Sequence, residues 1–124
     1  MKITDINGTV TLNNGVEMPY FGLGTWQSAA GSEVKNAILF AIDAGYKLID
    51  TATLYQNEKC IGEAIKESGV KREELFLTTK VWNDDQGFEN TLRAYENSLK
   101  LLGTDYIDLY LIHWPVTGKF KETW

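Results

Sequence analysis

The sequence has few of the features that mark secreted or membrane proteins. It contains a single cysteine, Cys60, so no disulfide can form within the chain, and its first residues, Met1–Asp5, lack the apolar core of a signal peptide. Its longest apolar run, Ala37–Ile42, is far shorter than the roughly 18 residues that indicate a membrane-spanning helix. We therefore expect a cytoplasmic protein with no transmembrane segment.

Positive charge is also scarce. Twelve Lys and Arg residues stand against 17 Asp and Glu residues, which gives a net charge of −5. Such a chain repels phosphate backbones and anionic headgroups, so neither nucleic acid nor a membrane surface is an expected partner. The remaining composition, 44% hydrophobic and 23% charged, is ordinary for one globular domain. We expect a single domain over residues 1–124.

The chain opens with a hairpin signal and continues as a repeated strand and helix unit. Asn13-Asn14-Gly15 predicts a hairpin over residues 8–18, because Asn-Gly tolerates positive φ at both turn positions. After Pro19, short apolar strands alternate with amphipathic helices that end near a glycine. This pattern predicts four strands and three helices over residues 20–113: strands Tyr20–Gly24, Tyr46–Asp50, Leu75–Lys80 and Tyr106–His113, and helices Ser32–Ala44, Asn57–Ser68 and Phe88–Leu102.

Strands that alternate with helices pair in parallel, because each crossover returns the chain to the same end of the sheet. The predicted class is therefore α/β, with two architectures open: a doubly wound sheet, or part of a (β/α)₈ barrel, which needs about 250 residues. Four units are half a barrel. Because the sequence shows no covering element between the fourth strand and Trp124, we expect a truncated protein with an open sheet edge.

Chemically varied side chains follow the predicted strands at their carboxyl ends, where parallel α/β proteins place their active sites. Taken singly, each has a structural explanation: Asp50 could cap a loop, and Lys80 could be a solvated strand end. Taken together, they favour a site, because several titratable groups converge on one concave rim. The residues of this rim are Thr25, Trp26, Asp50, Tyr55, Lys80, Trp82, His113 and Trp114.

Four of these residues suggest proton transfer to oxygen. A tyrosine beside a lysine is typical of a phenolic proton donor, because the ammonium of Lys80 would stabilise the phenolate of Tyr55. Asp50 would pair with Lys80, and His113 could polarise a substrate carbonyl. These groups can protonate a developing alkoxide, but none is a hydride donor. Reduction of a carbonyl therefore requires a cofactor.

Several segments match, in order, the early motifs of one family. The chain resembles the N-terminal half of an aldo-keto reductase, and most of all the bacterial glyoxal and keto-gluconate reductases and the prostaglandin F synthases. The segments that carry the resemblance are Phe21–Trp26, Ala44–Ala52, Tyr55–Glu58, Leu77–Trp82 and Asp105–Pro115.

The resemblance implies the N-terminal half of a (β/α)₈ barrel that follows a short β-hairpin, with NADPH/NADP⁺ as the cofactor. It implies reduction of small aldehydes and ketones, with Tyr55 as general acid and Asp50, Lys80 and His113 as its catalytic partners. Residues implied at the cofactor are Gly24, Thr25, Trp26 and Asp50, and those implied at the substrate are Trp26, Trp82 and Trp114. No metal is implied.

Two other functions stay open at this point. The first is a catalytically incompetent barrel fragment that assembles with another chain, because half a barrel exposes half of its core. On this basis we expect the full-length form to be a monomer and this half to self-associate. The second is a binding or regulatory subunit, which the intact set of Asp50, Tyr55, Lys80 and His113 argues against.

Other candidate motifs are weak. Gly22–Gln27 begins like a dinucleotide fingerprint but has glutamine where the third glycine belongs. Cys60 has no second cysteine or nearby histidine, so we interpret it as a structural thiol. Asp105 and Asp108 bracket a strand start, and we interpret them as solvated strand ends.

Overall fold

The computed structural model describes residues 5–124. The segment Met1–Asp5, in which we expect no signal peptide, lies outside the described residues except for Asp5. Short 3₁₀ turns at Thr53–Tyr55, Arg72–Glu74 and Asn83–Asp85 lie between the main elements. The strands are β1 (Thr9–Thr11), β2 (Glu17–Pro19), β3 (Gly22–Gly24), β4 (Leu48–Asp50), β5 (Phe76–Val81) and β6 (Leu109–Ile112), and the helices are α1 (Ser32–Asp43), α2 (Glu58–Ser68), α3 (Phe88–Leu102) and α4 (Phe120–Thr123).

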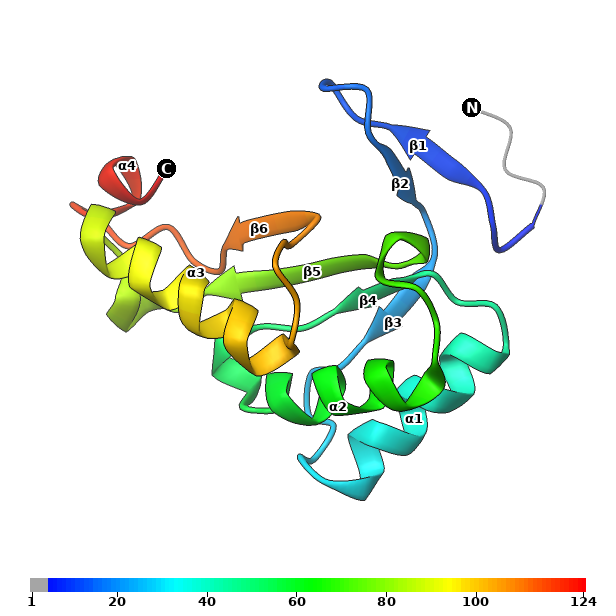
Figure 1. Cartoon of the computed structure of the whole chain (residues 1–124). Coiled ribbons are helices and arrows are strands. Elements are labelled where there is room, and N and C mark those ends of the chain that lie inside the picture. The colour runs from blue at the N-terminus through cyan, green and yellow to red at the C-terminus, as the bar shows by residue number, and fades with distance from the viewer. Residues whose placement is uncertain (1–4) are drawn as a thin grey trace.

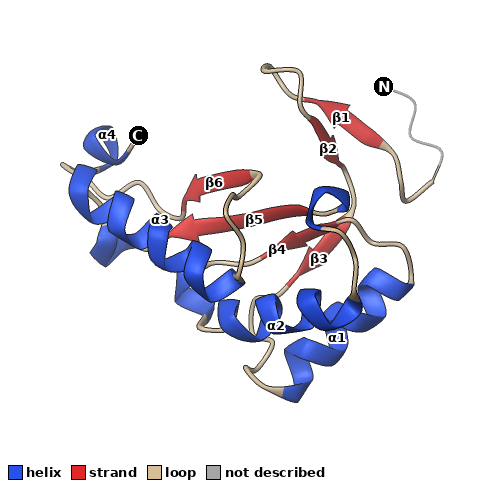
Figure 2. Ribbon diagram, in the orientation of Figure 1, coloured by secondary structure: helices blue, strands red, loops and turns tan. Residues whose placement is uncertain are grey.

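The main sheet is parallel, with the order β3-β4-β5-β6. Figure 1 and Figure 2 show the three crossover helices, α1, α2 and α3, along one face of this sheet. Neighbouring helices in this row contact one another. A doubly wound sheet carries helices on both faces, so the one-sided arrangement is that of a barrel wall. The predicted α/β class is confirmed.

The core lies between the sheet and this row of helices. Val34 and Ile38 of α1 and Ile61 of α2 are fully buried against Ile49 of β4, which faces the helices. The spacing of Val34 and Ile38 puts both side chains on one side of α1. Gly62 lets α2 and α3 approach closely, because a Cβ atom at this position would lie 2.5 Å from the carbonyl oxygen of Leu102.

β1 and β2 form the expected antiparallel hairpin before the sheet. Its turn differs from the predicted one: the amide of Gly15 donates to the carbonyl of Leu12 (2.9 Å), and the amide of Leu12 donates to that of Val16 (2.8 Å). Gly15 has a φ of 85°, whereas Asn14 does not have a positive φ. The loop is therefore three residues long with a glycine bulge, and only Gly15 of the Asn-Gly pair uses a positive φ.

The fourth parallel strand is shorter than predicted because Arg72 binds its first residues. The Arg72 guanidinium donates to the carbonyl of Tyr106 (3.0 Å) and to the carboxylate of Asp108 (2.6 Å). The same carboxylate accepts the amide hydrogen of Leu77 at 2.8 Å. Asp108 is thus an ion-paired link between β5 and the segment before β6, and its interpretation as a solvated strand end was wrong.

A short helix, α4, follows β6, but it does not cover the sheet edge, which we expected to be open. It contacts α3, and its Thr123 hydroxyl accepts the amide hydrogen of Gly87 at 2.9 Å. The sheet edge itself stays open, since β6 pairs only with β5 in the described sheet. Among the helices of residues 5–124, none has the length and apolar character needed to cross a bilayer.

Candidate active site

Three successive strand ends and one turn position the four predicted catalytic residues. Asp50 is the last residue of β4, and Lys80 lies one residue before the end of β5. His113 follows β6 directly, and its amide extends the ladder by donating to the carbonyl of Val81 at 3.2 Å. Tyr55 ends the 3₁₀ turn after β4. Parallel pairing therefore brings residues from distant parts of the chain together at the carboxyl ends of the strands.

The ammonium of Lys80 lies at the centre of this group. Its Nζ donates to Oδ2 of Asp50 and to the carbonyl of Thr51, both at 2.8 Å, and lies 3.4 Å from the hydroxyl of Tyr55. The Lys80 side chain is 14% exposed and that of Asp50 is 31% exposed, so this ion pair is partly shielded from solvent. Because Lys80 has donors only, the Tyr55 oxygen accepts from it, and the phenolic hydrogen is left for another acceptor.

His113 lies against two aromatic rings of the same site. Its ring meets the edge of Tyr55 with centroids 5.7 Å apart, and meets Trp82 with centroids 5.2 Å apart. Partial burial lowers the pKa of His113 below 6.5, the charge of Lys80 lowers it further, and Asp50 opposes both. The neutral imidazole is therefore the favoured form at neutral pH. Its Nδ1 atom is buried and has no hydrogen-bond partner among the described residues.

A buried asparagine that the sequence analysis did not identify holds the surrounding loops together. Asn57, 1% exposed, accepts a hydrogen bond from the Thr51 hydroxyl (2.8 Å) and donates to the carbonyls of Thr25 (3.0 Å) and Ser28 (3.2 Å). Thr25, also 1% exposed, donates from its hydroxyl to the carbonyl of Asp50 at 3.0 Å. In the sequence, Asn57 marks a helix start and belongs to the segment Tyr55–Glu58 that carries the family resemblance, but neither feature assigns it a role.

Gln86 is a second residue that the sequence analysis missed. Its side chain is 1% exposed, and its amide donates to the carbonyl of Trp114 at 2.6 Å, next to His113 in the chain. Its position in a polar loop gave no sequence signal of burial. The three predicted pocket tryptophans differ in environment: Trp82 packs on His113, whereas Trp26 is 67% exposed and Trp114 is 61% exposed.

The residues present fit the reactive end of a nicotinamide cofactor. Gly24 pairs with Asp50 in the sheet, and a Cβ atom built on it would meet nothing within 4 Å. A flat, uncharged ring can therefore approach the backbone beside Asp50. Lys80 is already paired with Asp50, so its charge is not available for the cofactor's phosphates. The fit concerns the nicotinamide end only.

Other candidate groups carry no comparable chemistry. Within residues 5–124, no cluster of three or more His, Cys, Asp or Glu side chains could hold a metal ion. Cys60 is half-buried in α2, and its sulfur accepts the amide hydrogen of Gly31 at 3.2 Å. This contact joins α2 to the start of α1, which agrees with a structural thiol.

Comparison with known proteins identifies the family. The sequence model described as the aldo/keto reductase family matches residues 21–124. The chain is 59% identical over 115 residues to a 9,11-endoperoxide prostaglandin H2 reductase of Trypanosoma cruzi, covering 93% of this chain and 41% of the relative. It is 57% identical over 121 residues to a glyoxal reductase of Bacillus subtilis, covering 98% and 44%. The chain belongs to the aldo/keto reductase family.

Solved structures support the same family assignment. An aldo/keto reductase from Brucella melitensis superposes with a TM-score of 0.91 at 51% identity, over 100% of this chain and 47% of that chain. A Bombyx mori aldo-keto reductase in complex with NADP gives a TM-score of 0.84 at 42% identity, over 97% and 42%. The chain thus spans less than half the length of these relatives. The expectation that it forms the N-terminal half of a (β/α)₈ barrel is confirmed.

Proposed function

We propose that this chain carries the proton-donating half of the active site of an NADPH-dependent reductase that converts small aldehydes and ketones to alcohols. The observation that carries the proposal is the contact of Lys80 with both Asp50 and Tyr55. The relatives named as glyoxal reductase and prostaglandin H2 reductase, and the neighbour in complex with NADP, support it. We further propose a cytoplasmic enzyme, since Cys60 needs no oxidising compartment.

The proposed chemistry divides into a hydride step and a proton step. The bound cofactor would supply a hydride to the carbonyl carbon. The carbonyl oxygen gains negative charge as this happens, and Tyr55 gives it a proton. Lys80 stabilises the phenolate that remains, and Asp50 keeps the Lys80 ammonium oriented toward Tyr55. His113, neutral at neutral pH, can donate a hydrogen bond to the same oxygen and orient the carbonyl.

Two groups of residues would hold the reactants. Gly24, Thr25, Trp26 and Asp50 would surround the nicotinamide end of the cofactor. Trp26, Trp82 and Trp114 would form an apolar wall for the substrate, which strengthens electrostatic interactions by excluding water. Of the three indoles, Trp82 is already fixed by its contact with His113, 5.2 Å between ring centroids.

NADPH oxidation with methylglyoxal tests this function. The wild-type protein should consume NADPH in proportion to the aldehyde, and Tyr55→Phe should lose about 100-fold or more of the rate, the usual contribution of a general acid. Tyr106→Phe is a matched control, because the Tyr106 ring stacks under Arg72 outside the site. Equal rates in wild type and Tyr55→Phe would refute the assignment of Tyr55.

A second candidate function is assembly, and the uncovered face of the sheet favours it. Leu111 of β6 is 37% exposed on the side opposite the helices, and β3 and β6 each have one neighbour in the sheet. We propose that a second copy of the chain covers this face, because open edges and apolar faces favour association. Light scattering tests it: a dimer supports the proposal, and a monodisperse monomer at high concentration contradicts it.

A further inference from the structure

A groove lies beside the contact between α2 and the end of α3, on the helix side of the sheet. Its volume is about 430 Å³, within the range of roughly 300–1,000 Å³ typical of small-molecule sites. Its apolar lining consists of Ile65, Val70, Leu77, Leu101 and Leu102. Leu77 and Lys80 lie three residues apart on β5, so their side chains face opposite sides of the sheet. The groove is therefore distinct from the candidate active site.

The charge around this groove is opposite to that of the chain as a whole. Four cations line it, Lys59, Lys66, Arg72 and Lys100, with one carboxylate, Glu63. Glu63 is paired with Lys35 at 3.0 Å, and Arg72 is paired with Asp108 at 2.6 Å.

Three exposed lysines, Lys59, Lys66 and Lys100, then remain outside the ion pairs found among residues 5–124. On a protein with a net charge of −5, the border of this groove is locally positive.

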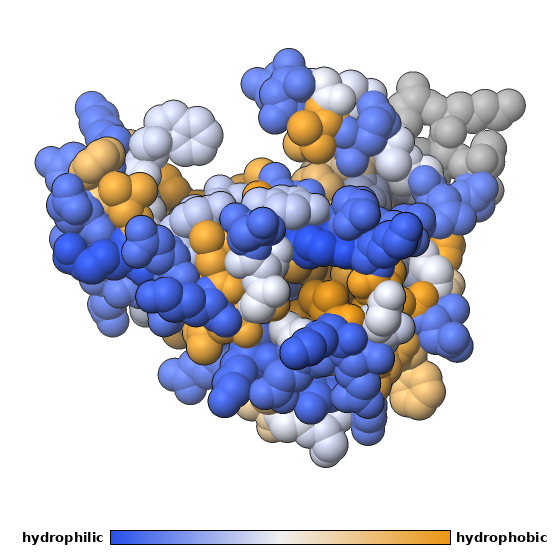
Figure 3. All heavy atoms as spheres, viewed as in Figure 1, coloured by the Kyte–Doolittle hydropathy of each residue, from blue (hydrophilic) through white to orange (hydrophobic). Residues whose placement is uncertain are grey.

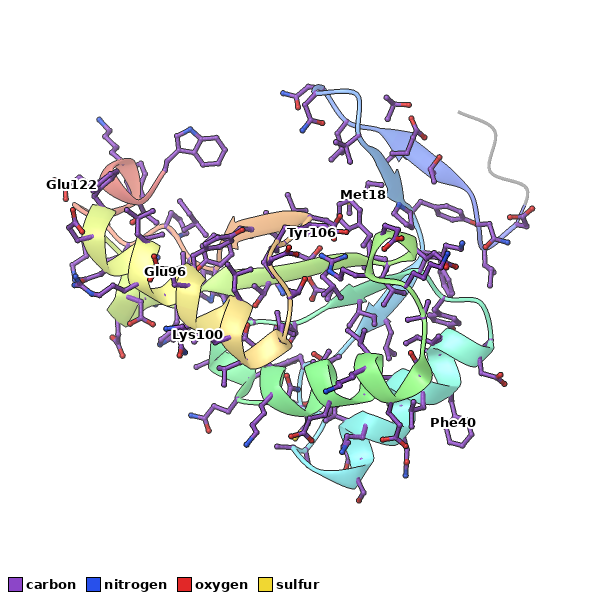
Figure 4. The ribbon with its side chains drawn as sticks, in the orientation of Figure 1. Met18, Phe40, Glu96, Lys100, Tyr106 and Glu122 are labelled. Carbon is purple, nitrogen blue, oxygen red and sulfur yellow. The ribbon has the colours of Figure 1, made fainter. Side chains whose placement is uncertain are left out.

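The surface shows the same combination. In Figure 3 a hydrophobic area lies above α2, with hydrophilic side chains above and below it. Figure 4 shows Lys100 on α3 and Tyr106 in the segment that leads from α3 to β6. Tyr106 packs under the guanidinium of Arg72, 3.9 Å from its ring centroid, so this wall of the groove is fixed. A ligand would find an apolar floor and a cationic border together.

We propose that the groove binds a free, single-chain amphiphilic anion, such as a medium-chain aliphatic carboxylate. The aliphatic chain would cover Val70 and Leu101, the half-buried apolar residues of the groove, and remove their surface from water. The carboxylate would lie among the lysines, where its charge is complementary. A neutral amphiphile would gain only the first of these terms, and a cationic one would be repelled. The proposal does not depend on the reductase function.

Decanoate, decanol and decyltrimethylammonium provide a matched set of probes, used with the full chain below the concentrations at which they aggregate. Binding is followed by amide chemical shifts in ¹H–¹⁵N spectra. Decanoate should shift the amides of Gly62 and Gly103, which line the groove. The double variant Lys66→Glu, Lys100→Glu should weaken decanoate binding at least tenfold, and Lys66→Gln, Lys100→Gln should weaken it less.

The control is the double variant Lys47→Glu, Lys119→Glu, which makes the same charge change at exposed positions outside the groove. It should bind decanoate as the wild type does. The proposal is overturned if decanol binds as tightly as decanoate, or if decanoate shifts only the amide of Leu111 on the uncovered sheet face. It is also overturned if this control weakens decanoate binding as much as Lys66→Glu, Lys100→Glu does. Circular dichroism of each variant establishes that it is folded, and none of these readouts uses reductase activity.

Discussion

The Nζ atom of Lys80 lies 3.4 Å from the hydroxyl oxygen of Tyr55, and it is held there by Asp50 at 2.8 Å. The lysine thus approaches the phenol as a donor, so Tyr55 retains its own proton for a substrate oxygen. A cation beside a phenol also stabilises the phenolate that forms when the proton leaves. This pair of contacts underlies the reductase proposal, and most of the predictions below test groups around it.

Replacing Lys80 with methionine should slow carbonyl reduction by about 100-fold or more at neutral pH, because Tyr55 loses the charge that stabilises its phenolate. The rate of NADPH oxidation at saturating aldehyde measures the effect. Lys35→Met is the matched control, since Lys35 pairs with Glu63 on the surface. A Lys80→Met enzyme as fast as this control would show that Tyr55 does not need the ammonium.

His113 should make stability depend on pH. The folded pKa lies below the unfolded value of 6.5, so the unfolded chain binds more protons in the interval between them. The contribution of His113 is therefore fully present above pH 6.5 and decreases as the pH falls through that interval. Urea unfolding at neutral pH and at about pH 5.5 should show a larger loss of stability in wild type than in His113→Gln. Equal losses would contradict the lowered pKa.

Glu58 should make the stability depend on pH in the opposite direction to His113. Its side chain is 2% exposed, and burial raises its pKa above 4.5. Hydrogen bonds from Ser98 and Thr79 lower the pKa, but by less than burial raises it. The folded protein then binds more protons than the unfolded chain between 4.5 and that raised pKa, so the free energy of unfolding falls as pH rises through this interval.

Glu58→Gln cannot ionise but still accepts the hydrogen bond from Thr79. It should therefore be more stable than wild type at neutral pH, with the gain vanishing in acid, where Glu58 is protonated in both states. Thermal unfolding of both proteins at neutral and at acidic pH measures this difference in stability. A variant that is less stable than wild type at neutral pH would mean that the carboxylate stabilises the fold.

Asn57→Ala should cost about 2 kcal/mol of unfolding free energy, because it leaves the buried Thr51 hydroxyl without its acceptor and removes a donor from the carbonyl of Thr25. It should also raise the KM for NADPH more than it lowers kcat, since the segment from Thr25 to Ser28 is no longer tied to α2. Asn97→Ala, at an exposed position, is the control and should change stability by less than about 0.5 kcal/mol. A parallel loss in both variants would show that the buried network contributes nothing specific.

The sequence predicted the elements whose ends are encoded locally. Helix α3 has the predicted bounds, Phe88–Leu102, because its apolar stripe is regular and Gly103 adopts the left-handed conformation at its end. The start of β6 was placed three residues too early, because Arg72, 34 residues from Tyr106 in the chain, binds the carbonyl that a strand would otherwise use. No local pattern carries that information.

The residues of the candidate site likewise divide into those that local sequence predicts and those that depend on contacts distant in the chain. Asp50, Lys80 and His113 could be grouped from the sequence because strand ends meet at one edge of a parallel sheet. Asn57 and Gln86 could not, because each is defined by contacts with carbonyls of distant loops, Thr25 and Trp114. Their burial depends on how loops close over the strand ends, and a polar residue in a loop gives no periodic signal of it.

The most direct test of the central claim is NADPH oxidation with methylglyoxal by wild type, Tyr55→Phe and the control Tyr106→Phe. Wild type and Tyr106→Phe should oxidise NADPH only when the aldehyde is present, and Tyr55→Phe should lose about 100-fold or more of this rate with its fold intact. Oxidation at the same rate in all three proteins, or none in wild type, would contradict the claim that Tyr55, positioned by Lys80 and Asp50, donates the proton in carbonyl reduction.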